Sequence, residues 1–435
     1  MRPVLTFFFD ALKPDSLQHM PFLNSFTYQR RMRTELGYSV TCHPSMYSGV
    51  HPDKHLQWFV WKYAPAASPF GWARVFKYLG FLDNLPARYF LHKYTRMFRE
   101  KNTAWFGVPL LVNLPLKYWP YFDVVEDRAW DEPGYLAEYP TIFDLLRRHN
   151  VDFEIIGMTK GAGDEFVQIG EHEFHEIRPW TYFFLGSVDG YSHRYGQHAP
   201  ETIERLRRLD QLVEAKYREY SQRVSVFDVF VFSDHGHIPV ERQVDLDEHF
   251  RRHGSRLHSF INLVEANYAR FWFHTDQERA VVERILSTLE GGFVLGDDQL
   301  HRYHLEMPDH RYGDLIFYLD RPAIFSKTIW GFSRNQKSMH GYLPEYPGSD
   351  GVFLSQRSLV EDTHVELVDV LPTLLNSLDL PIPDYVDGRV LWAKGGLSKR
   401  TDGPSTGKMA NPQEPSPSAR EYGVRSTYGQ VYSTG

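Results

Sequence analysis

The sequence has little cysteine and no long apolar run. Cys42 is the single cysteine among 435 residues, which excludes an intrachain disulfide and a zinc ribbon and is typical of a reducing compartment. The first apolar segment, residues 4–9, ends at Asp10 and is too short for a signal-peptide core or a membrane span. We therefore expect a cytoplasmic protein in which residues 4–9 form a buried strand.

An excess of positive charge is also missing. The formal net charge is −7, so the chain lacks the overall basic surface that nucleic-acid binding usually requires, and we expect no nucleic-acid partner. Hydrophobic residues make up 42% and charged residues 24%, which is typical of a soluble enzyme. A chain of this length can bury a large core, and we expect one large α/β domain with insertions.

Helix and strand patterns alternate along the chain. Residues 141–149 and 201–220 have apolar side chains at helical spacing, and short apolar runs follow at 151–156 and 229–232. Residues 180–185 form a further strand candidate. This order predicts an α/β fold with a mostly parallel central sheet and helices on both faces, in which functional residues gather beyond the carboxyl ends of the strands.

Two segments interrupt this alternation. Residues 58–127 form an aromatic and basic stretch that predicts an insertion or cap, and residues about 245–318 are a candidate second subdomain. The last part of the chain is rich in Gly, Pro, Ser and Thr, which predicts a disordered tail over residues 395–435. The catalytic domain is accordingly predicted to span residues 1–394.

The aromatic insertion, residues 58–127, has two interpretations. We favour a packed cap in which Trp and Tyr side chains form a small second core, because such residues are more often structural than ligand-stacking. The alternative is a surface that faces an anionic, partly apolar substrate, such as a nucleotide-sugar or a lipid-linked phosphodiester, or that makes peripheral contact with a membrane.

Carboxylate and imidazole side chains occur together in three short motifs. Asp234 and His235 follow the predicted strand 229–232, and Asp189 and His193 are four residues apart, so a helical turn presents both on one face. His340 stands beside a glycine. Each motif alone is as compatible with a capping turn as with a metal site, but Asp and His together are the ligands that borderline divalent metals prefer.

A hydroxyl-rich segment, residues 37–49, lies near a predicted helix start. Backbone N–H groups at a helix start can hold an anion, and Ser39, Thr41 and Cys42 are the candidate nucleophiles in this segment. The alternative is an ordinary Ser/Thr-rich turn.

In their order these motifs resemble the alkaline phosphatase superfamily, in particular its nucleotide pyrophosphatase/phosphodiesterase branch (type I phosphodiesterases), over about residues 4–393. That branch has an Asp after the first strand, a Ser or Thr nucleophile ten residues before the Gly of a Thr-Gly or Ser-Gly pair, Asp-x-x-x-His, Asp-His-Gly and a late His-Gly. The resemblance implies one metal ion held by Asp189, His193 and His340, and another held by Asp10, Asp234, His235 and the Ser39 hydroxyl.

The choice of nucleophile depends on spacing. Ser39 lies ten residues before Gly49, as in the branch, and Thr41 is the alternative. Cys42 begins a sequence similar to the sulfatase signature, but that signature needs an arginine where this chain has Met46. We therefore expect Ser39 to attack and to form a phosphoseryl intermediate.

The substrate contacts of the branch do not transfer to this chain. The branch supplies an asparagine to the phosphate about 21 residues after the nucleophile, and this chain has Val60 at that offset. Lys62 or Tyr63 are the substitute donors that the sequence offers.

The predicted function is a metal-dependent phosphoesterase that hydrolyses phosphodiester or pyrophosphate bonds of a small-molecule substrate. The mixed Asp/His sets favour Zn²⁺ over magnesium, with Mn²⁺ as the alternative. A phosphomonoesterase, a phosphonate hydrolase or a sulfatase on the same fold remains an alternative, because these enzymes share the metal ligands. A binding protein that has lost the chemistry ranks low, since all seven implied positions are filled.

Overall fold

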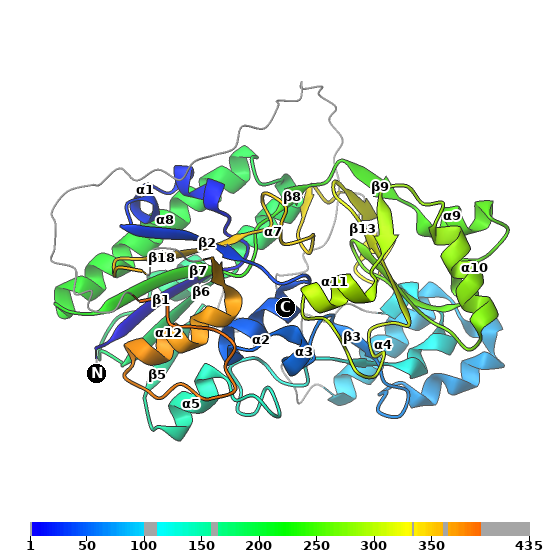
Figure 1. The fold of residues 1–435 in the computed structure, drawn as a ribbon, viewed down its shortest axis with the longest axis horizontal. Helices are drawn as coiled ribbons and strands as arrows, with labels where there is room; N and C mark the ends of the chain where they lie inside the picture. The colour runs from blue at the N-terminus through cyan, green and yellow to red at the C-terminus, as the bar shows by residue number, and fades with distance from the viewer. Residues whose placement is uncertain (1, 100–110, 158–163, 333–334, 360–363, 393–435) are drawn as a thin grey trace.

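A seven-stranded sheet forms the centre of the larger part of the molecule (Figure 1). The computed structural model describes residues 2–99, 111–157, 164–332, 335–359 and 364–392. The strand order is β19-β2-β18-β7-β1-β6-β5, and all neighbours are parallel except that β18 runs antiparallel to β2 and β7. The strands are β1 (Val4–Phe9), β2 (Tyr28–Arg33), β5 (Phe153–Ile156), β6 (Trp180–Leu185), β7 (Asp228–Ser233), β18 (Gly351–Ser355) and β19 (Val365–Glu366).

Both faces of this sheet are covered by helices, which confirms the predicted fold class. All six side chains of β1 are buried, as expected for a parallel strand between two helical layers. Val4 and Phe8 pack against one layer, and Leu5, Phe7 and Phe9 pack against the other. The first layer contains α2 (Ser39–Ser48), α5 (Ile142–Arg148) and α12 (Val370–Ser377), and the second contains α1 (Pro21–Asn24), α6 (Glu165–Gly170) and α8 (Pro200–Arg223).

The predicted elements of this sheet occur close to their expected bounds. Strands β1 and β6 have the bounds read from the sequence, and α8 extends the predicted helix 201–220 by a few residues. Strand β5 starts at Phe153 rather than at the predicted Val151. The N–H of Val151 still donates to the carbonyl oxygen of Leu146 at 2.9 Å, so Val151 closes the end of α5 instead of entering the sheet.

A second, antiparallel sheet lies beside the first, on the right of Figure 1, within the segment predicted as a second subdomain. Its order is β10-β11-β13-β12, with β10 (Ile261–Val264), β11 (Tyr268–Trp272), β12 (Gly292–Val294) and β13 (Leu315–Leu319). Helices α9 (Leu246–Arg252) and α10 (Asp276–Leu286) pack on it around a core that includes Phe250 and Phe271.

The aromatic insertion begins and ends as a hairpin-like pair. Strand β3 (Trp61–Tyr63) pairs antiparallel with β4 (Phe122–Val124), so the two ends of the segment lie side by side. Between them lie η2 (Gly71–Lys77), η3 (Gly80–Leu82), α4 (Leu85–Arg99), η5 (Leu111–Asn113) and η6 (Leu116–Tyr121). Trp61, Phe70 and Trp119 form a buried cluster that packs on Trp272 of the second sheet.

Shorter elements complete the described chain. These are η1 (Pro14–His19), α3 (Pro52–His55), α7 (Ser187–Tyr195), β8 (Ile238–Pro239), β9 (Arg242–Val244), η7 (Leu257–Ser259), α11 (Asp297–Arg302), β14 (Ala323–Phe325), β15 (Lys327–Thr328), β16 (Gly331–Phe332), β17 (Ser338–Met339) and η8 (Leu367–Asp369). No helix in the described ranges combines the length and the apolar character needed to cross a bilayer. The predicted disordered tail, residues 395–435, lies outside the described residues.

Candidate metal centre

Three parallel strands deliver carboxylates to one edge of the large sheet. Asp10 directly follows β1, and Asp234 directly follows β7. Helix α7 begins two residues after the end of β6 and contains Asp189. The last residues of these three strands are aligned in register, and carboxyl ends of neighbouring parallel strands meet at the same edge. The predicted convergence of the three aspartates is therefore a consequence of the sheet.

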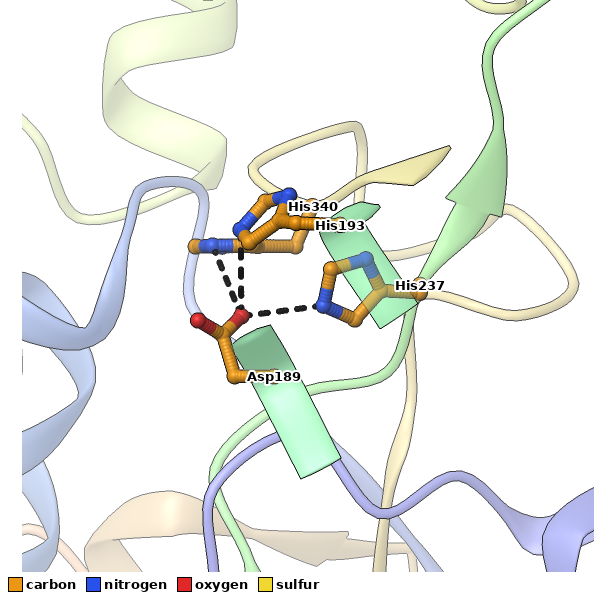
Figure 2. Close-up of side chains that lie close together, drawn as sticks. All are labelled: Asp189, His193, His237 and His340. Carbon is orange, nitrogen blue, oxygen red and sulfur yellow. Dashed lines mark hydrogen bonds and ion pairs between the residues drawn. The ribbon is translucent and has the colours of Figure 1, made fainter. Parts of the chain in front are cut away.

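The first group of ligand atoms is centred on Asp189. Its Oδ1 lies 2.9 Å from Nε2 of His237, 3.2 Å from Nε2 of His193 and 3.5 Å from Nε2 of His340. Figure 2 shows the three imidazoles pointing at this one oxygen from different directions. We call Asp189, His193, His237 and His340 the Asp189 group.

The backbone and a serine hold the imidazoles of the Asp189 group. Asp189 and His193 share one face of α7. Nδ1 of His193 donates to the carbonyl oxygen of Ser338 at 2.9 Å, and Nδ1 of His237 lies 3.0 Å from the Ser338 hydroxyl. Strand β17, which carries Ser338, pairs with β8 immediately after His237. A single residue thus orients two imidazoles, as the outer partners of metal-binding histidines usually do.

Burial and the contacts among its members shift the pKa values of the Asp189 group. Burial lowers the pKa of His237 to about 3 and lowers the pKa of His340 well below its usual range. Burial alone would raise the pKa of Asp189, but attraction to His193 and the close contacts of His193 and His237 lower it well below its ordinary value. Ionised carboxylate and neutral imidazole are the states that bind a divalent metal.

The second group contains Asp10, Asp234 and His235, and we call it the Asp10 group. Nε2 of His235 lies 3.2 Å from Asp234 Oδ2 and 3.6 Å from Asp10 Oδ1. Within the described part of the chain, both of these buried oxygens lack a hydrogen-bond partner. Burial, together with the charges of Asp234 and Asp189, raises the pKa of Asp10 well above its usual value. Unpaired buried carboxylate oxygens are costly on their own and fit a site for a cation.

The two groups are adjacent. The rings of His235 and His340 stack with centroids 3.9 Å apart and an interplanar angle of 9°. Gly236 lets the loop that carries His235 and His237 pack closely on residues 348–350, because a Cβ there would lie 2.3 Å from the carbonyl oxygen of Gly348 and 2.8 Å from that of Asp350. Any larger residue would push the loop that carries His235 and His237 away from its neighbours.

Ser39 is the first residue of α2 and faces the Asp10 group. Its Oγ lies 3.1 Å from Nε2 of His235. Helix α2 has ten residues and ends at Gly49, which has a left-handed φ of 71°. The ten-residue spacing between Ser39 and Gly49 is therefore the length of one helix followed by its C-cap.

The two other candidate nucleophiles, Thr41 and Cys42, make their contacts outside the two ligand groups. The Thr41 hydroxyl is fully buried and donates to the carbonyl oxygen of Trp58 at 2.5 Å. The Cys42 thiol is also buried, 3.5 Å from the Thr34 hydroxyl, and burial raises its pKa well above the usual value. Among these three candidates, Ser39 is the residue whose described contacts reach the ligand groups.

Lys62 and Tyr63 lie in β3, inside the aromatic insertion. The Tyr63 ring stacks on Tyr121 and on Trp272, with centroids 5.7 and 5.5 Å away. These contacts belong to the core of the insertion, and a substrate-binding role for Lys62 and Tyr63 stays a prediction.

Two histidines near the site were absent from the sequence-based ligand set. His237 joins the Asp189 group, and the buried His43 has its Nε2 3.7 Å from Asp234 Oδ2. Burial lowers the pKa of His43 to about 4. The signal for His237 was its place directly after Asp234-His235-Gly236, and the signal for His43 was its place on the same helix as Ser39.

The donor sets suit a borderline divalent metal. Each group mixes Asp oxygen and His nitrogen, as zinc sites do, whereas magnesium prefers oxygen ligands and retained water. The orphaned oxygens of the Asp10 group and the converging imidazoles of the Asp189 group fit such ions at both places.

The chain is similar in sequence to one protein family and in fold to several solved structures. Residues 128–343 match the model of the family described as Type I phosphodiesterase / nucleotide pyrophosphatase. The solved structures of human and murine ectonucleotide pyrophosphatase / phosphodiesterase 5 each superpose with a TM-score of 0.59 at 13% identity, covering 88% of this chain and 96% of theirs. An inactive variant of the murine protein in complex with AMP matches equally well. No curated protein matches the chain in sequence.

Proposed function

We propose that the chain is a relative of the type I phosphodiesterase / nucleotide pyrophosphatase family in the alkaline phosphatase superfamily, that it is a metal-dependent hydrolase of phosphodiester or pyrophosphate bonds, and that Ser39 is its nucleophile. The observation that carries this proposal is the position of the Ser39 hydroxyl, 3.1 Å from His235 in the Asp10 group and at the first residue of α2.

Each group of residues has its own part in the reaction. Asp10, Asp234, His235 and Ser39 would hold one divalent ion, and Asp189, His193 and His340 would hold the other. When bound, two such ions lower the pKa of a serine hydroxyl and stabilise the charge that develops on the attacking and leaving oxygens. The start of α2 points backbone N–H groups at the place where the phosphoryl oxygens would lie, which stabilises their negative charge.

The reaction has two displacement steps. In the first, Ser39 Oγ loses its proton and forms a bond to phosphorus, while the bond from phosphorus to the leaving oxygen breaks and the leaving oxygen takes up a proton. This step leaves a phosphoseryl ester, which keeps one substituent if the substrate is a diester. In the second step, water attacks phosphorus, the bond to Ser39 Oγ breaks, and the serine hydroxyl regains a proton.

We propose zinc as the metal and two ions per chain, with manganese as the alternative. The support is the Asp/His composition of both groups and the stacking of His235 on His340, which makes the groups neighbours. Metal analysis of protein purified without added metal tests both parts. Two equivalents of zinc agree with the proposal, and a single equivalent or a predominance of another metal contradicts it.

We propose a small phosphoester of nucleotide type as the substrate. The support is the AMP bound by the murine structure that shares this fold. The purified enzyme and its Ser39→Ala variant should be assayed with an aryl phosphodiester, an aryl phosphomonoester and an aryl sulfate, with and without Zn²⁺. Preferred turnover of the diester is expected, and preferred turnover of the sulfate would replace the proposed function by a sulfatase.

We also propose that the aromatic insertion contacts an anionic membrane surface. Nine of the fourteen large hydrophobic side chains that are exposed in the described chain lie within residues 72–94, including Tyr78 at 81% and Phe81 at 80% exposure. The same segment carries exposed Arg74, Lys77 and Lys93, although the whole chain has a net charge of −7. Aromatic side chains flanked by basic ones are typical of interfacial contact with anionic lipid.

Vesicle sedimentation tests the membrane contact. Binding to vesicles of anionic lipid, weaker binding to neutral vesicles, and loss of binding in a Phe81→Ser/Phe90→Ser variant are expected. Val226→Ser is the matched control, because Val226 is 59% exposed on the catalytic part of the chain. The proposal fails if the wild-type protein stays in the supernatant, or if concentration-dependent self-association accounts for the sedimentation.

A further inference from the structure

His237 is a buried imidazole that the seven implied ligands leave without a role. It is 1% exposed and lies between α7 and β17. Its two ring nitrogens have different neighbours: Nε2 is 2.9 Å from Asp189 Oδ1, and Nδ1 is 3.0 Å from the hydroxyl oxygen of Ser338.

Ser338 determines which nitrogen of neutral His237 carries the hydrogen. The Ser338 hydroxyl donates its single hydrogen to the carbonyl oxygen of Ser192 at 2.6 Å, since a carbonyl can only accept. Its oxygen must then accept from His237. The N–H of the neutral imidazole is therefore at Nδ1, and Nε2 carries a lone pair.

The lone pair on His237 Nε2 faces Asp189 Oδ1, an atom that cannot donate a hydrogen bond. Oδ1 of the Asp189 carboxylate is an acceptor, so a contact of 2.9 Å brings two electron-rich atoms together in a buried place. Nε2 of His193 and Nε2 of His340 approach the same oxygen at 3.2 and 3.5 Å (Figure 2). Such a convergence is stable when a cation lies among the atoms.

We propose that His237 is a fourth protein ligand of the metal ion held by Asp189, His193 and His340. This inference rests on the proposed metal-dependent function. Four protein ligands complete the coordination that zinc has in structural sites, whereas catalytic sites keep a position free. The Asp189 group therefore holds its ion more tightly than the Asp10 group, whose fourth ligand is the reacting Ser39 hydroxyl.

Stepwise metal loading tests the role of His237. Metal-free protein is titrated with Co²⁺ while the visible absorption is recorded. The Zn²⁺ affinity of the tighter of the two sites, which we assign to the Asp189 group, is measured by competition with a chromogenic chelator. His237→Ala should weaken the tighter site by more than about 100-fold, beyond the loss caused by removing an outer hydrogen-bond partner, and should change the Co²⁺ spectrum.

Two variants separate a ligand from a positioning residue. Ser338→Ala removes only the hydroxyl next to His237 Nδ1, so it should weaken the site by about 10–100-fold and leave the spectrum unchanged. The side chain in His237→Gln can donate a hydrogen bond to Asp189 but is a poor zinc ligand, so this variant should behave like His237→Ala. Circular dichroism of the metal-free variants verifies that they are folded.

Two results would overturn the inference. The first is a loss of metal affinity smaller than about 100-fold with an unchanged spectrum in His237→Ala. The second is recovery of wild-type affinity in His237→Gln. Both results are expected of a residue that only orients Asp189. The proposed function is judged by a separate result: wild-type protein that binds two equivalents of metal but hydrolyses no phosphoester contradicts the function and leaves His237 as a ligand.

Discussion

The Asp189 group and the Asp10 group lie side by side yet differ in composition. The Asp189 group has one carboxylate and three imidazoles, two of which are oriented by Ser338. The Asp10 group has two carboxylates and one imidazole, with the Ser39 hydroxyl beside it and two buried carboxylate oxygens that have no hydrogen-bond partner among the described residues. Under our proposal, the first group holds its ion more tightly, while the second lies beside the nucleophile.

Removal of the nucleophile should have the largest effect. Ser39→Ala should lower phosphodiester turnover by about 10⁴-fold or more, because no described hydroxyl of the segment replaces it at the Asp10 group. Steady-state assays with saturating Zn²⁺ measure this loss. Ser48→Ala is the matched control on the same helix, since the Ser48 hydroxyl donates to the carbonyl oxygen of Pro44, and its activity should stay near that of the wild type. Equal losses in both variants would contradict a special role for Ser39.

Removal of one charge from the Asp10 group should have the next largest effect. Asp234→Asn should lower kcat/KM by about 10²–10³-fold, because a charge that stabilises the ion beside the nucleophile is lost. It should also lower the bound metal by one equivalent without changing the tighter site. Asp228→Asn is the control at the other end of β7, where Asp228 pairs with Arg2 and Arg357. Loss of metal from the tighter site in Asp234→Asn would break the distinction between the groups.

Removal of an imidazole from the Asp189 group should act first on metal retention. His193→Ala should weaken the tighter metal site by more than about 100-fold, the loss expected on removing an outer partner, and excess Zn²⁺ should restore much of the activity. Chelator competition and assays over a range of Zn²⁺ concentrations measure the two effects. His55→Ala, which removes another buried histidine, should leave both unchanged. An activity loss in His193→Ala that excess metal does not relieve would give this group a direct catalytic role.

A change in the support of Ser39 should have the smallest effect. Gly49→Ala should lower the free energy of unfolding by about 1–2 kcal/mol, because alanine is strained at a positive φ. Its Cβ would also meet Leu371 and Val386 at 3.0 Å. Gly254→Ala separates the two causes, since Gly254 has the same φ of 71° and a Cβ added there would meet nothing within 4 Å. Denaturant unfolding should show a larger loss for Gly49→Ala, and metal affinity of the Asp189 group should not change in either variant.

The sequence predicted the position of the site better than its full membership. Asp10, Asp189 and Asp234 follow strands whose parallel direction could be predicted from helix and strand alternation, so their convergence followed from the parallel sheet. His237 could not be assigned in this way. From the sequence alone, a residue after a glycine can point to either side of the chain, and the direction of His237 is set by the pairing of β8 with β17, about 100 residues apart.

The same limit applies to the fold. The antiparallel direction of β18 and the four-stranded sheet of β10–β13 depend on pairing between distant segments, and the apolar pattern of one strand does not specify its partner. The helix α2 was different, because Gly49 marks its end and Ser39 its start. The spacing that favoured Ser39 over Thr41 has a local physical cause.

Rapid quenching of the enzyme during phosphodiester turnover, followed by peptide mass analysis, tests Ser39 as the residue that carries the reaction. We expect a phosphoryl adduct on the peptide that contains Ser39, present in the metal-loaded wild type and absent from metal-free protein and from Ser39→Ala. An adduct on another residue, or full turnover by Ser39→Ala, would contradict the assignment of Ser39 as the nucleophile.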